Sequence, residues 1–288
     1  MAFVVFRREL DGGSDQRESH RRFGSGKVEN WDMNLSLRNA IMSSITAFMV
    51  ALWLSLISTV MAQDAVPEEI LQRTVLIKVG NSVGTAFSID YEGKLYLVTA
   101  KHVVSGLPES NATIQVRRGD RWDDVHTVKT LFPPSSNVDI VVFETNERVK
   151  QPFEVAIIGD TGGPAFGQQV WFLGYPWGIH TRASNRELPF IKRGTMSAID
   201  ATDTNAMVLY IDGFNNPGFS GGPILYWDFG KHGYRLMGVV QGYRNDTAKV
   251  LVNGQQVDTN LLVNSGILVG YSIEHAIQAI QRGQKGQP

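Results

Sequence analysis

Short apolar stretches recur along residues 74–143, and in each of them apolar and polar positions tend to alternate before a glycine, proline, asparagine or aspartate follows. A period of two is typical of a β-strand with one buried face, because successive side chains point to opposite sides of a sheet. The strands expected in this half are residues 74–79, 84–89, 94–99, 112–116, 128–132 and 140–143.

The same pattern starts again beyond the stretch DTGGP at residues 160–164, which we interpret as a linker. Two such runs of about six strands predict an all-β protein of two six-stranded antiparallel β-barrels, with residues 63–160 in the first and 161–288 in the second. Asn253-Gly254 is a favoured two-residue hairpin turn. The strands expected in the second half are residues 168–173, 190–199, 207–211, 223–226 and 236–240, with that hairpin after them.

Only the end of the chain has a helical period. Apolar residues recur at helical spacing from Ile273 to Ile280, Ser272 is placed to cap the start, and Gly283 is placed to close the end. We expect a short C-terminal helix that docks on a barrel.

A long uncharged stretch precedes the β pattern. Arg38 is followed by residues 39–63 without a charge, and this run closes with Val-Met-Ala at 60–62. A basic flank, an apolar middle and small residues before the cut are the parts of a secretory signal peptide, so we expect cleavage after Ala62 and an exported protein, periplasmic or secreted. The alternative is an uncleaved membrane anchor over residues 40–62.

Residues 1–62 are therefore expected to be a leader and signal peptide. The first 32 residues are highly charged, and translation from Met33 would give a short basic start to the signal. Cleavage leaves 288 − 62 = 226 residues, which is long enough to fold without disulfides.

Composition and charge exclude several classes of function. A formal net charge of −1 and a pI near 6.6 give no electrostatic footprint for nucleic acid, so we expect no such partner. The absence of cysteine excludes thiol nucleophiles, disulfides and thiolate metal sites. The six histidines are scattered without a familiar ligand spacing, so we expect no metal and no cofactor.

Residues 216–223, NPGFSGGP, place one serine in a turn dense in glycine. Glycines permit positive φ and allow backbone N–H groups to point at a developing oxyanion, which suits a nucleophile at Ser220. A tight hairpin turn explains the same residues. The choice depends on a histidine base and a carboxylate elsewhere.

His102 ends an expected strand in LVTAKHVV, and Asp139 precedes another in NVDIVVF. Each has an ordinary structural explanation when taken alone. Together with Ser220 they follow the order His, Asp, Ser, with the serine in the second half. In such a triad the aspartate orients the imidazole, the imidazole takes the serine proton, and the serine attacks a carbonyl.

At this point the chain resembles the trypsin-like serine proteases of the chymotrypsin fold, and in particular the protease domain of the HtrA/DegP group without a PDZ domain. The resemblance covers about residues 70–282. The motifs that carry it are TAKH at 99–102, DIVV at 139–142 and GFSGGP at 218–223, with secondary matches in GTAF at 84–87, GYPWG at 174–178, RGTMS at 193–197 and VGYSI at 269–273.

The resemblance implies a serine endopeptidase that works through an acyl-enzyme, in protein quality control or processing. It implies His102 as the base, Asp139 as its orienting acid and Ser220 as the nucleophile. The N–H groups of Gly218 and Ser220 would form the oxyanion hole. Polypeptides are the expected substrates, a homo-oligomer is compatible with the group, and no stable membrane partner is expected unless the signal stays uncleaved.

Two departures from the family pattern limit which properties the resemblance implies for this chain. Phe219 stands where digestive members carry an aspartate that pairs with a freshly cut N-terminus, so zymogen activation of that type is not expected. No PDZ-like module follows the helix, so trimerisation and peptide-triggered activation are not carried over.

Substrate preference is assigned by resemblance alone. Phe214 would lie near the floor of the S1 pocket, with Val240, Gln241 and Gly242 along one wall. Because no acid stands at Phe214, a basic P1 side chain is disfavoured, and we expect a small or medium apolar one.

Two rival readings remain. GFSGG also fits the G-x-S-x-G motif of α/β-hydrolases, but that motif needs a helix directly after the serine, and the Gly-Gly-Pro that follows is hostile to one. The other rival is a non-catalytic peptide-binding or chaperone-like protein that keeps the protease fold. Labelling by a fluorophosphonate that is lost on Ser220→Ala distinguishes the enzyme from this rival.

Overall fold

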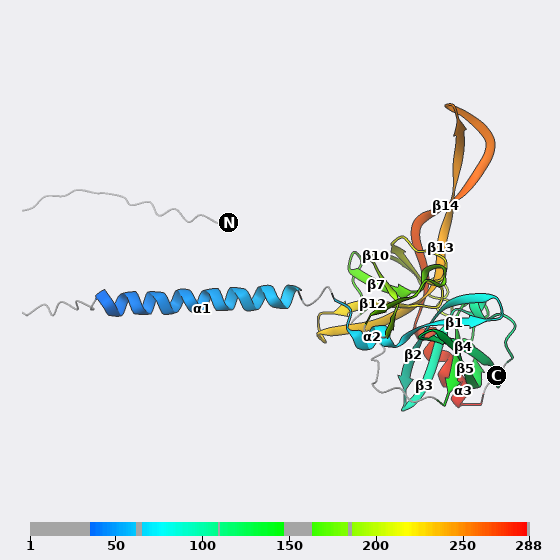
Figure 1. The fold of residues 1–288 in the computed structure, drawn as a ribbon, viewed down its shortest axis with the longest axis horizontal. Helices are drawn as coiled ribbons and strands as arrows, with labels where there is room; N and C mark the ends of the chain where they lie inside the picture. The colour runs from blue at the N-terminus through cyan, green and yellow to red at the C-terminus, as the bar shows by residue number, and fades with distance from the viewer. Residues whose placement is uncertain (1–34, 62–64, 109, 147–162, 184–185, 287–288) are drawn as a thin grey trace, which may run out of the picture. The chain divides into compact units, whose positions relative to one another are not determined.

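The computed structural model describes residues 35–61, 65–108, 110–146, 163–183 and 186–286 (Figure 1). The chain divides into two units, Met1–Val60 and Met61–Pro288, which are described separately. The expected cleavage point at residue 62 and the expected boundary at residue 160 lie outside the described residues.

The first unit contains one helix, α1, Leu35–Met61. It covers most of the uncharged stretch, with no acidic residue in its first turn and no basic residue in its last. Over the described part of the chain, no helix combines the length and the apolar character that a membrane span requires.

The second unit begins with the short helix α2, Glu68–Gln72, and a first barrel whose strands follow the order β1-β2-β3-β6-β5-β4. Pairing of β1 with β4 closes it. Its core is built from inward-facing residues such as Ile77, Phe143 and Val116. The strands are β1 Thr74–Val79, β2 Ser82–Tyr91, β3 Lys94–Thr99, β4 Thr113–Arg118, β5 Arg121–Leu131 and β6 Val141–Thr145, and the 3₁₀ turn η2, Lys101–Val104, follows β3.

The second barrel follows the order β10-β11-β14-β13-β12-β7 and closes through β7 and β10. Phe172, Met196 and Leu209 lie in its core. The strands are β7 Gln169–Gly174, β10 Phe190–Asp200, β11 Val208–Asp212, β12 Pro223–Asp228, β13 Gly233–Val252 and β14 Gln255–Ser272, with η3 Pro176–Gly178 and the small pair β8 Thr181–Ala183 and β9 Arg186–Leu188 between β7 and β10. The prediction of two six-stranded antiparallel barrels is confirmed.

Strands β13 and β14 extend beyond the barrel as a two-stranded arm, drawn in orange in Figure 1. The strand predicted at residues 236–240 is shorter than β13, which continues to Val252. The polar outer half of β13 is held by backbone pairing with β14 and does not require a buried face. Asn253 and Gly254 turn the arm with φ of 51° and 78°, which is the positive φ that the predicted turn requires.

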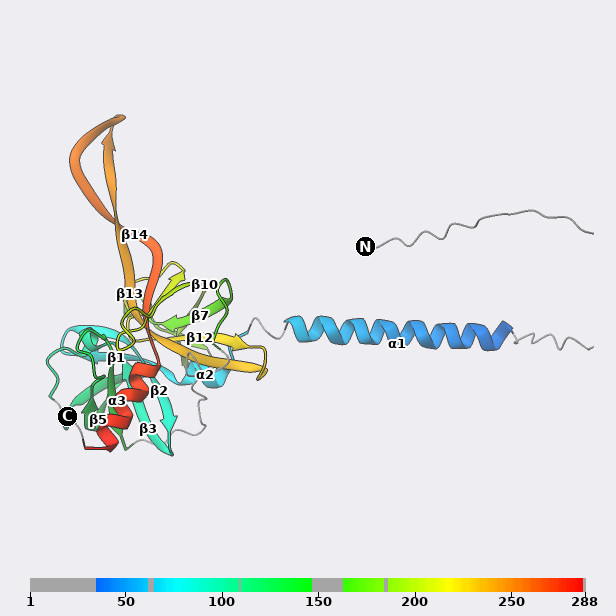
Figure 2. The same cartoon turned by 180° about the vertical axis from the view of Figure 1, so that it is seen from behind.

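Helix α3, Glu274–Gln284, returns to the first barrel (Figure 2). The N-cap is Ile273, which has no side-chain cap bond, and Ser272, expected as the cap, precedes it and accepts the N–H of Glu274 through Oγ at 3.3 Å. The prediction that Gly283 ends the helix is wrong, because the helix continues to Gln284. Gly283 packs closely against β5 instead, since a Cβ there would lie 2.4 Å from Cδ2 of the Leu131 side chain.

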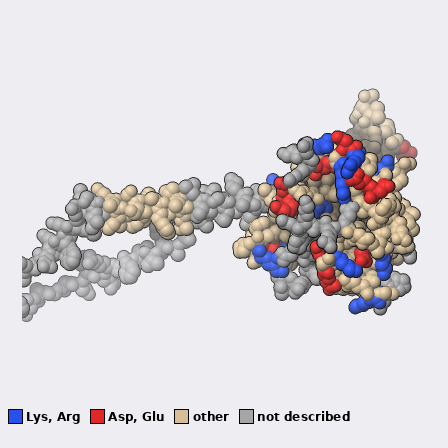
Figure 3. All heavy atoms as spheres, turned by 60° about the horizontal axis from the view of Figure 1, so that its bottom comes forward, with Lys and Arg blue, Asp and Glu red and all other residues tan. Residues whose placement is uncertain are grey.

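Basic and acidic side chains of the second unit are interspersed on the face that Figure 3 shows. This mixture agrees with the formal net charge of −1. The described residues on that face therefore form no broad patch of one sign.

Candidate active site

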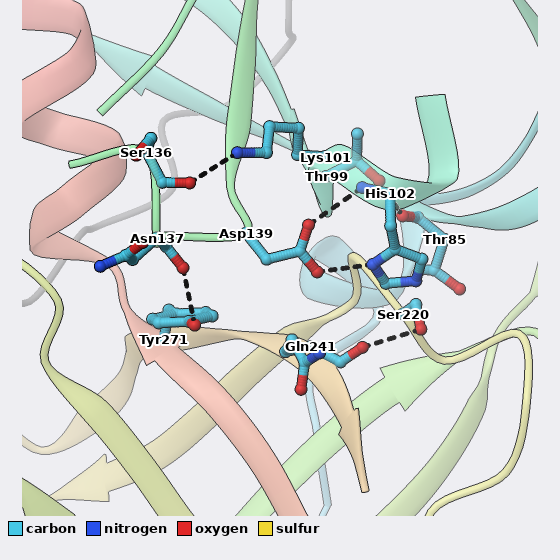
Figure 4. A network of polar contacts seen from close by, with 10 residues as sticks. All are labelled: Thr85, Thr99, Lys101, His102, Ser136, Asn137, Asp139, Ser220, Gln241 and Tyr271. Atoms are coloured by element: carbon cyan, nitrogen blue, oxygen red, sulfur yellow. Dashed lines mark hydrogen bonds and ion pairs between the residues drawn. The ribbon is translucent and has the colours of Figure 1, made fainter. Parts of the chain in front are cut away.

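The three expected triad residues come from both barrels. His102 lies in η2, directly after β3, and Asp139 lies just before β6, so both belong to the first barrel. Ser220 lies in the turn before β12 of the second barrel. Figure 4 shows the three side chains gathered where the barrels meet.

Asp139 contacts His102 twice, once at the imidazole and once at the backbone. Its Oδ2 lies 2.5 Å from His102 Nδ1, and its Oδ1 accepts the backbone N–H of His102 at 2.9 Å. A carboxylate on Nδ1 favours the tautomer with the proton on that nitrogen, which leaves Nε2 as an acceptor. In Figure 4 the ring nitrogen remote from Asp139 faces Ser220.

The segment before Asp139 is fixed by two residues that sequence reasoning did not assign. Lys101 Nζ donates to Ser136 O at 2.8 Å, and Tyr271 OH donates to Asn137 O at 2.9 Å. Burial, followed by the charge of Asp139, raises the pKa of Tyr271. Both residues lie in matched motifs, TAKH and VGYSI, but the motifs alone do not say what they contact.

The glycines around Ser220 are required by both conformation and space. Gly218 has φ of 100°, and a Cβ there would lie 2.2 Å from the carbonyl oxygen of Tyr175. Gly221 has φ of 85°, and a Cβ there would lie 2.1 Å from the carbonyl oxygen of Thr85. Real Cβ atoms do not approach this closely, so the turn excludes larger residues at both positions.

Thr85 of β2 joins the first barrel to the serine turn. Its N–H donates to Ser220 O at 3.0 Å and its hydroxyl donates to Gly218 O at 2.7 Å. The same hydroxyl accepts the N–H of Tyr175 at 3.1 Å, and Thr99 Oγ1 donates to Thr85 O at 2.7 Å. Thr85 lies in the matched GTAF motif, and no role was assigned to it from sequence.

The N–H groups of Gly218 and Ser220 are the donors expected for an oxyanion hole. Pro217 O accepts the N–H of Trp177 at 2.8 Å, and every described peptide bond is trans, so the N–H of Gly218 points away from Trp177. Within the described residues, the N–H groups of Gly218 and Ser220 have no protein acceptor. They are therefore available to an oxygen of a ligand.

The hydroxyl of Ser220 forms its hydrogen bond with a backbone carbonyl rather than with His102. Its Oγ donates to the carbonyl oxygen of Gln241 at 3.0 Å (Figure 4). Rotation about the Cα–Cβ bond changes that partner without moving the backbone. The arrangement brings the side chains of Ser220 and His102 to the same place.

The four residues expected around the S1 pocket lie in different settings. Val240 is fully buried in the core of the second barrel, and its backbone pairs with Gly221 and Gly222. Gly242 O accepts Asn215 Nδ2 at 3.0 Å, and Gln241 contacts Ser220 through its carbonyl. Phe214 has an exposed side chain, and its carbonyl accepts Lys192 Nζ at 2.8 Å.

Phe219, which replaces an acid in the resembled pattern, is fully buried. Its ring packs edge-on against Phe172 with centroids 5.4 Å apart. A carboxylate in this position would be desolvated, so an apolar ring suits the core.

Among the described residues there is also no group of three His, Asp or Glu side chains placed to hold a metal ion.

Comparison with known proteins gave one family and several relatives. The model of the trypsin-like peptidase domain matches residues 84–230. The chain is 26% identical over 157 residues to the serine protease Do-like HtrA of Bacillus subtilis (strain 168), which covers 52% of this chain and 31% of that protein. It is 27% identical over 147 residues to the magnetosome formation protease MamE of Paramagnetospirillum magneticum, covering 50% and 18%.

The fold resembles that of solved proteases. An inactive form of Rv3671c from M. tuberculosis H37Rv, a serine-to-alanine mutant, aligns with a TM-score of 0.50 and 17% identity, covering 77% of this chain and 91% of that one. The aligned region spans less than a third of the curated relatives' own lengths, at 31% and 18%.

Proposed function

Since the chain belongs to the trypsin-like peptidase domain family, whose members are serine endopeptidases, we propose that it hydrolyses peptide bonds with Ser220 as nucleophile. His102 is the general base, and Asp139 orients it. The observation that carries the proposal is the imidazole of His102, which is bonded through Nδ1 to Asp139 and faces Ser220 across the junction of the barrels.

The first step begins with the Ser220 hydroxyl. It rotates from the carbonyl of Gln241 toward Nε2 of His102, which takes its proton while Oγ attacks the carbonyl carbon of the substrate. Asp139, bonded to Nδ1–H, stabilises the imidazolium that forms. The carbonyl π electrons move to oxygen and produce a tetrahedral oxyanion.

We assign the N–H groups of Gly218 and Ser220 as donors to this oxyanion, and the support is that neither has a protein acceptor among the described residues. Because the Pro217 carbonyl is already bonded to Trp177, the Gly218 N–H needs no peptide flip before reaction. Such preorganised donors act where charge develops in the transition state.

Collapse of the intermediate releases the amine. The imidazolium gives its proton to the leaving nitrogen, the C–N bond breaks, and an acyl-enzyme remains on Ser220 Oγ. His102 then takes a proton from water, the hydroxide attacks the ester carbonyl, and the proton returns to Oγ as the acid product leaves.

Fluorophosphonate labelling and peptide hydrolysis test the assignment. We expect covalent labelling of the wild-type chain and loss of both labelling and turnover in Ser220→Ala and His102→Ala. Ser82→Ala and His126→Ala are matched controls, because both side chains are exposed in the first barrel, and they should retain both activities.

Turnover in Ser220→Ala would refute the nucleophile. Labelling of the wild type that survives Ser220→Ala would place the reaction at another residue. No labelling together with tight binding of unfolded polypeptides would favour a non-catalytic peptide-binding protein.

Its substrates are proposed to be polypeptides outside the cytoplasm. The support is Arg38 followed by the uncharged residues 39–63. N-terminal sequencing of the exported protein should give Gln63 as the first residue, whereas a membrane-retained chain that keeps residues 40–62 would show an anchor instead.

A further inference from the structure

Lys192 of β10 reaches the segment that carries the nucleophile, residues 214–220. Its Nζ donates to Phe214 O at 2.8 Å and also to Asn216 Oδ1. The same ammonium lies 5.5 Å from the ring centroid of Phe214 and 5.3 Å from that of Phe219. The cation therefore contacts both the beginning of the segment and the residue next to Ser220.

All of the contacts of this ammonium are with neutral groups. Among the described residues, no Asp or Glu forms an ion pair with Lys192. Burial lowers the pKa of Lys192. A flexible lysine at a barrel surface normally keeps its ammonium in water, so partial burial without a counter-ion disfavours this position unless the bonds to the segment offset it.

Those bonds act on the part of the segment that the first barrel does not reach. Thr85 of the first barrel holds the carbonyls of Gly218 and Ser220, and the N–H of Trp177 in η3 holds the carbonyl of Pro217. Among the described residues, 214–216 are tied to groups of the second barrel, and Lys192 supplies the charged side chain in these ties. The other ties are the amide of Asn215 to Gly242 O at 3.0 Å and the amide of Asn264 to Asn215 O at 2.6 Å.

Asn216 links this earlier part to the serine. Its side-chain oxygen accepts Lys192 Nζ, and its carbonyl accepts the N–H of Phe219 at 3.3 Å. Fixing Asn216 thus restricts the peptide units on either side of Phe219, which carry the N–H groups of Phe219 and Ser220. The cation contacts the Phe219 ring as well, so side chain and backbone of that residue are restrained together.

We propose that Lys192 is a positioning residue whose ammonium orders residues 214–220 from within the second barrel and so holds the Ser220 and Gly218 N–H groups in line for an oxyanion. The ordering of the segment stands on the contacts alone, and its effect on catalysis rests on the proposed function. Ordering of the segment by Lys192 needs no newly cut N-terminus. It is compatible with Phe219 in place of an acid, because the ammonium binds carbonyl, amide and ring acceptors.

The test compares Lys192→Met, Lys192→Arg and the control Lys94→Met. Methionine keeps the length of the side chain but removes the charge and the donors, and Lys94 is an exposed lysine paired with Glu144 in the first barrel. Backbone hydrogen exchange of peptides covering 213–223 is measured in all three and in the wild type, together with kcat, KM and the rate of fluorophosphonate labelling.

In Lys192→Met we expect hydrogen exchange to be about tenfold faster, and only in this segment. We also expect kcat to fall by about 100-fold with little change in KM, because small displacements of the reacting groups have effects of this size. Lys192→Arg should restore part of the exchange protection and part of the kcat. Lys94→Met should change neither.

Unchanged exchange in Lys192→Met overturns the ordering role, and so does faster exchange spread evenly over both barrels. Local loosening with wild-type kcat overturns the link to catalysis. If the wild type neither labels nor turns over, the proposed function fails, while the exchange comparison still decides whether Lys192 orders the segment.

Discussion

Replacing Thr85 by valine removes one hydroxyl and keeps the shape of a β-branched side chain on β2. The hydroxyl accepts the N–H of Tyr175 and donates to the carbonyl of Gly218. Both bonds join the first barrel to the turn that carries Ser220. The valine variant therefore separates this polar connection from packing.

The expected effect follows from burial. Tyr175 is almost fully buried, so its N–H is left without a partner and without water, which costs about 1–3 kcal/mol. The carbonyl of Gly218 is only partly buried, so the net loss of its bond is about 1 kcal/mol. We expect Thr85→Val to lower the free energy of unfolding by about 2–4 kcal/mol.

Urea unfolding measures this loss, and kcat measures its effect on the turn. Thr85→Ser is the matched control because it keeps both bonds and loses one buried methyl group, which costs about 1 kcal/mol. The reasoning is refuted if the Thr85→Val variant is at least as stable as the Thr85→Ser variant. It is also refuted if Thr85→Val leaves both stability and kcat at wild-type values.

Three further outcomes are expected. Gly221→Ala should abolish soluble folded protein, measured by yield and circular dichroism, while Gly254→Ala, with a similar positive φ but no atom within 4 Å, should lower stability by only about 1–2 kcal/mol. Burial lowers the pKa of His275, whose Nε2 accepts the N–H of Met207 at 2.8 Å. The unfolded state therefore binds a proton at His275 more readily than the folded state does. The stability that His275 contributes is complete above pH ~6.5 and is lost as the pH falls through the folded pKa. Urea midpoints at several pH values should show this pH dependence, and His275→Gln should abolish it. Tyr271→Phe should lower kcat by about tenfold with stability changed by about 1 kcal/mol, since it frees the carbonyl of Asn137, two residues before Asp139, and unchanged kinetics would contradict this.

The barrels were predictable because strand alternation and turn chemistry are local. Asn253-Gly254 specifies its own positive φ, and the apolar alternation of residues 74–79 agrees with β1 as observed. The arm was underestimated because its outer half has no buried face, and a search for core-facing alternation stops at residue 240.

The candidate site was predictable to the extent that motifs mark it. The order of His102, Asp139 and Ser220 and the glycines around the serine are visible in the sequence, and the structure brings these side chains together. The contacts of Thr85 and Lys192 were not predictable. Their partners lie 133 residues away for Thr85 and 22 residues away for Lys192, and no local pattern specifies which carbonyl a side chain will meet.

The return of α3 to the first barrel has a consequence for the order in which this protein is made. Ile277 and Ile280 of the helix belong to the same apolar core as Leu131 and Val98 of the first barrel. During synthesis from the N-terminus, that core stays open until the ribosome has passed residue 284. A nascent chain can thus display His102 and Asp139 long before the helix closes this core.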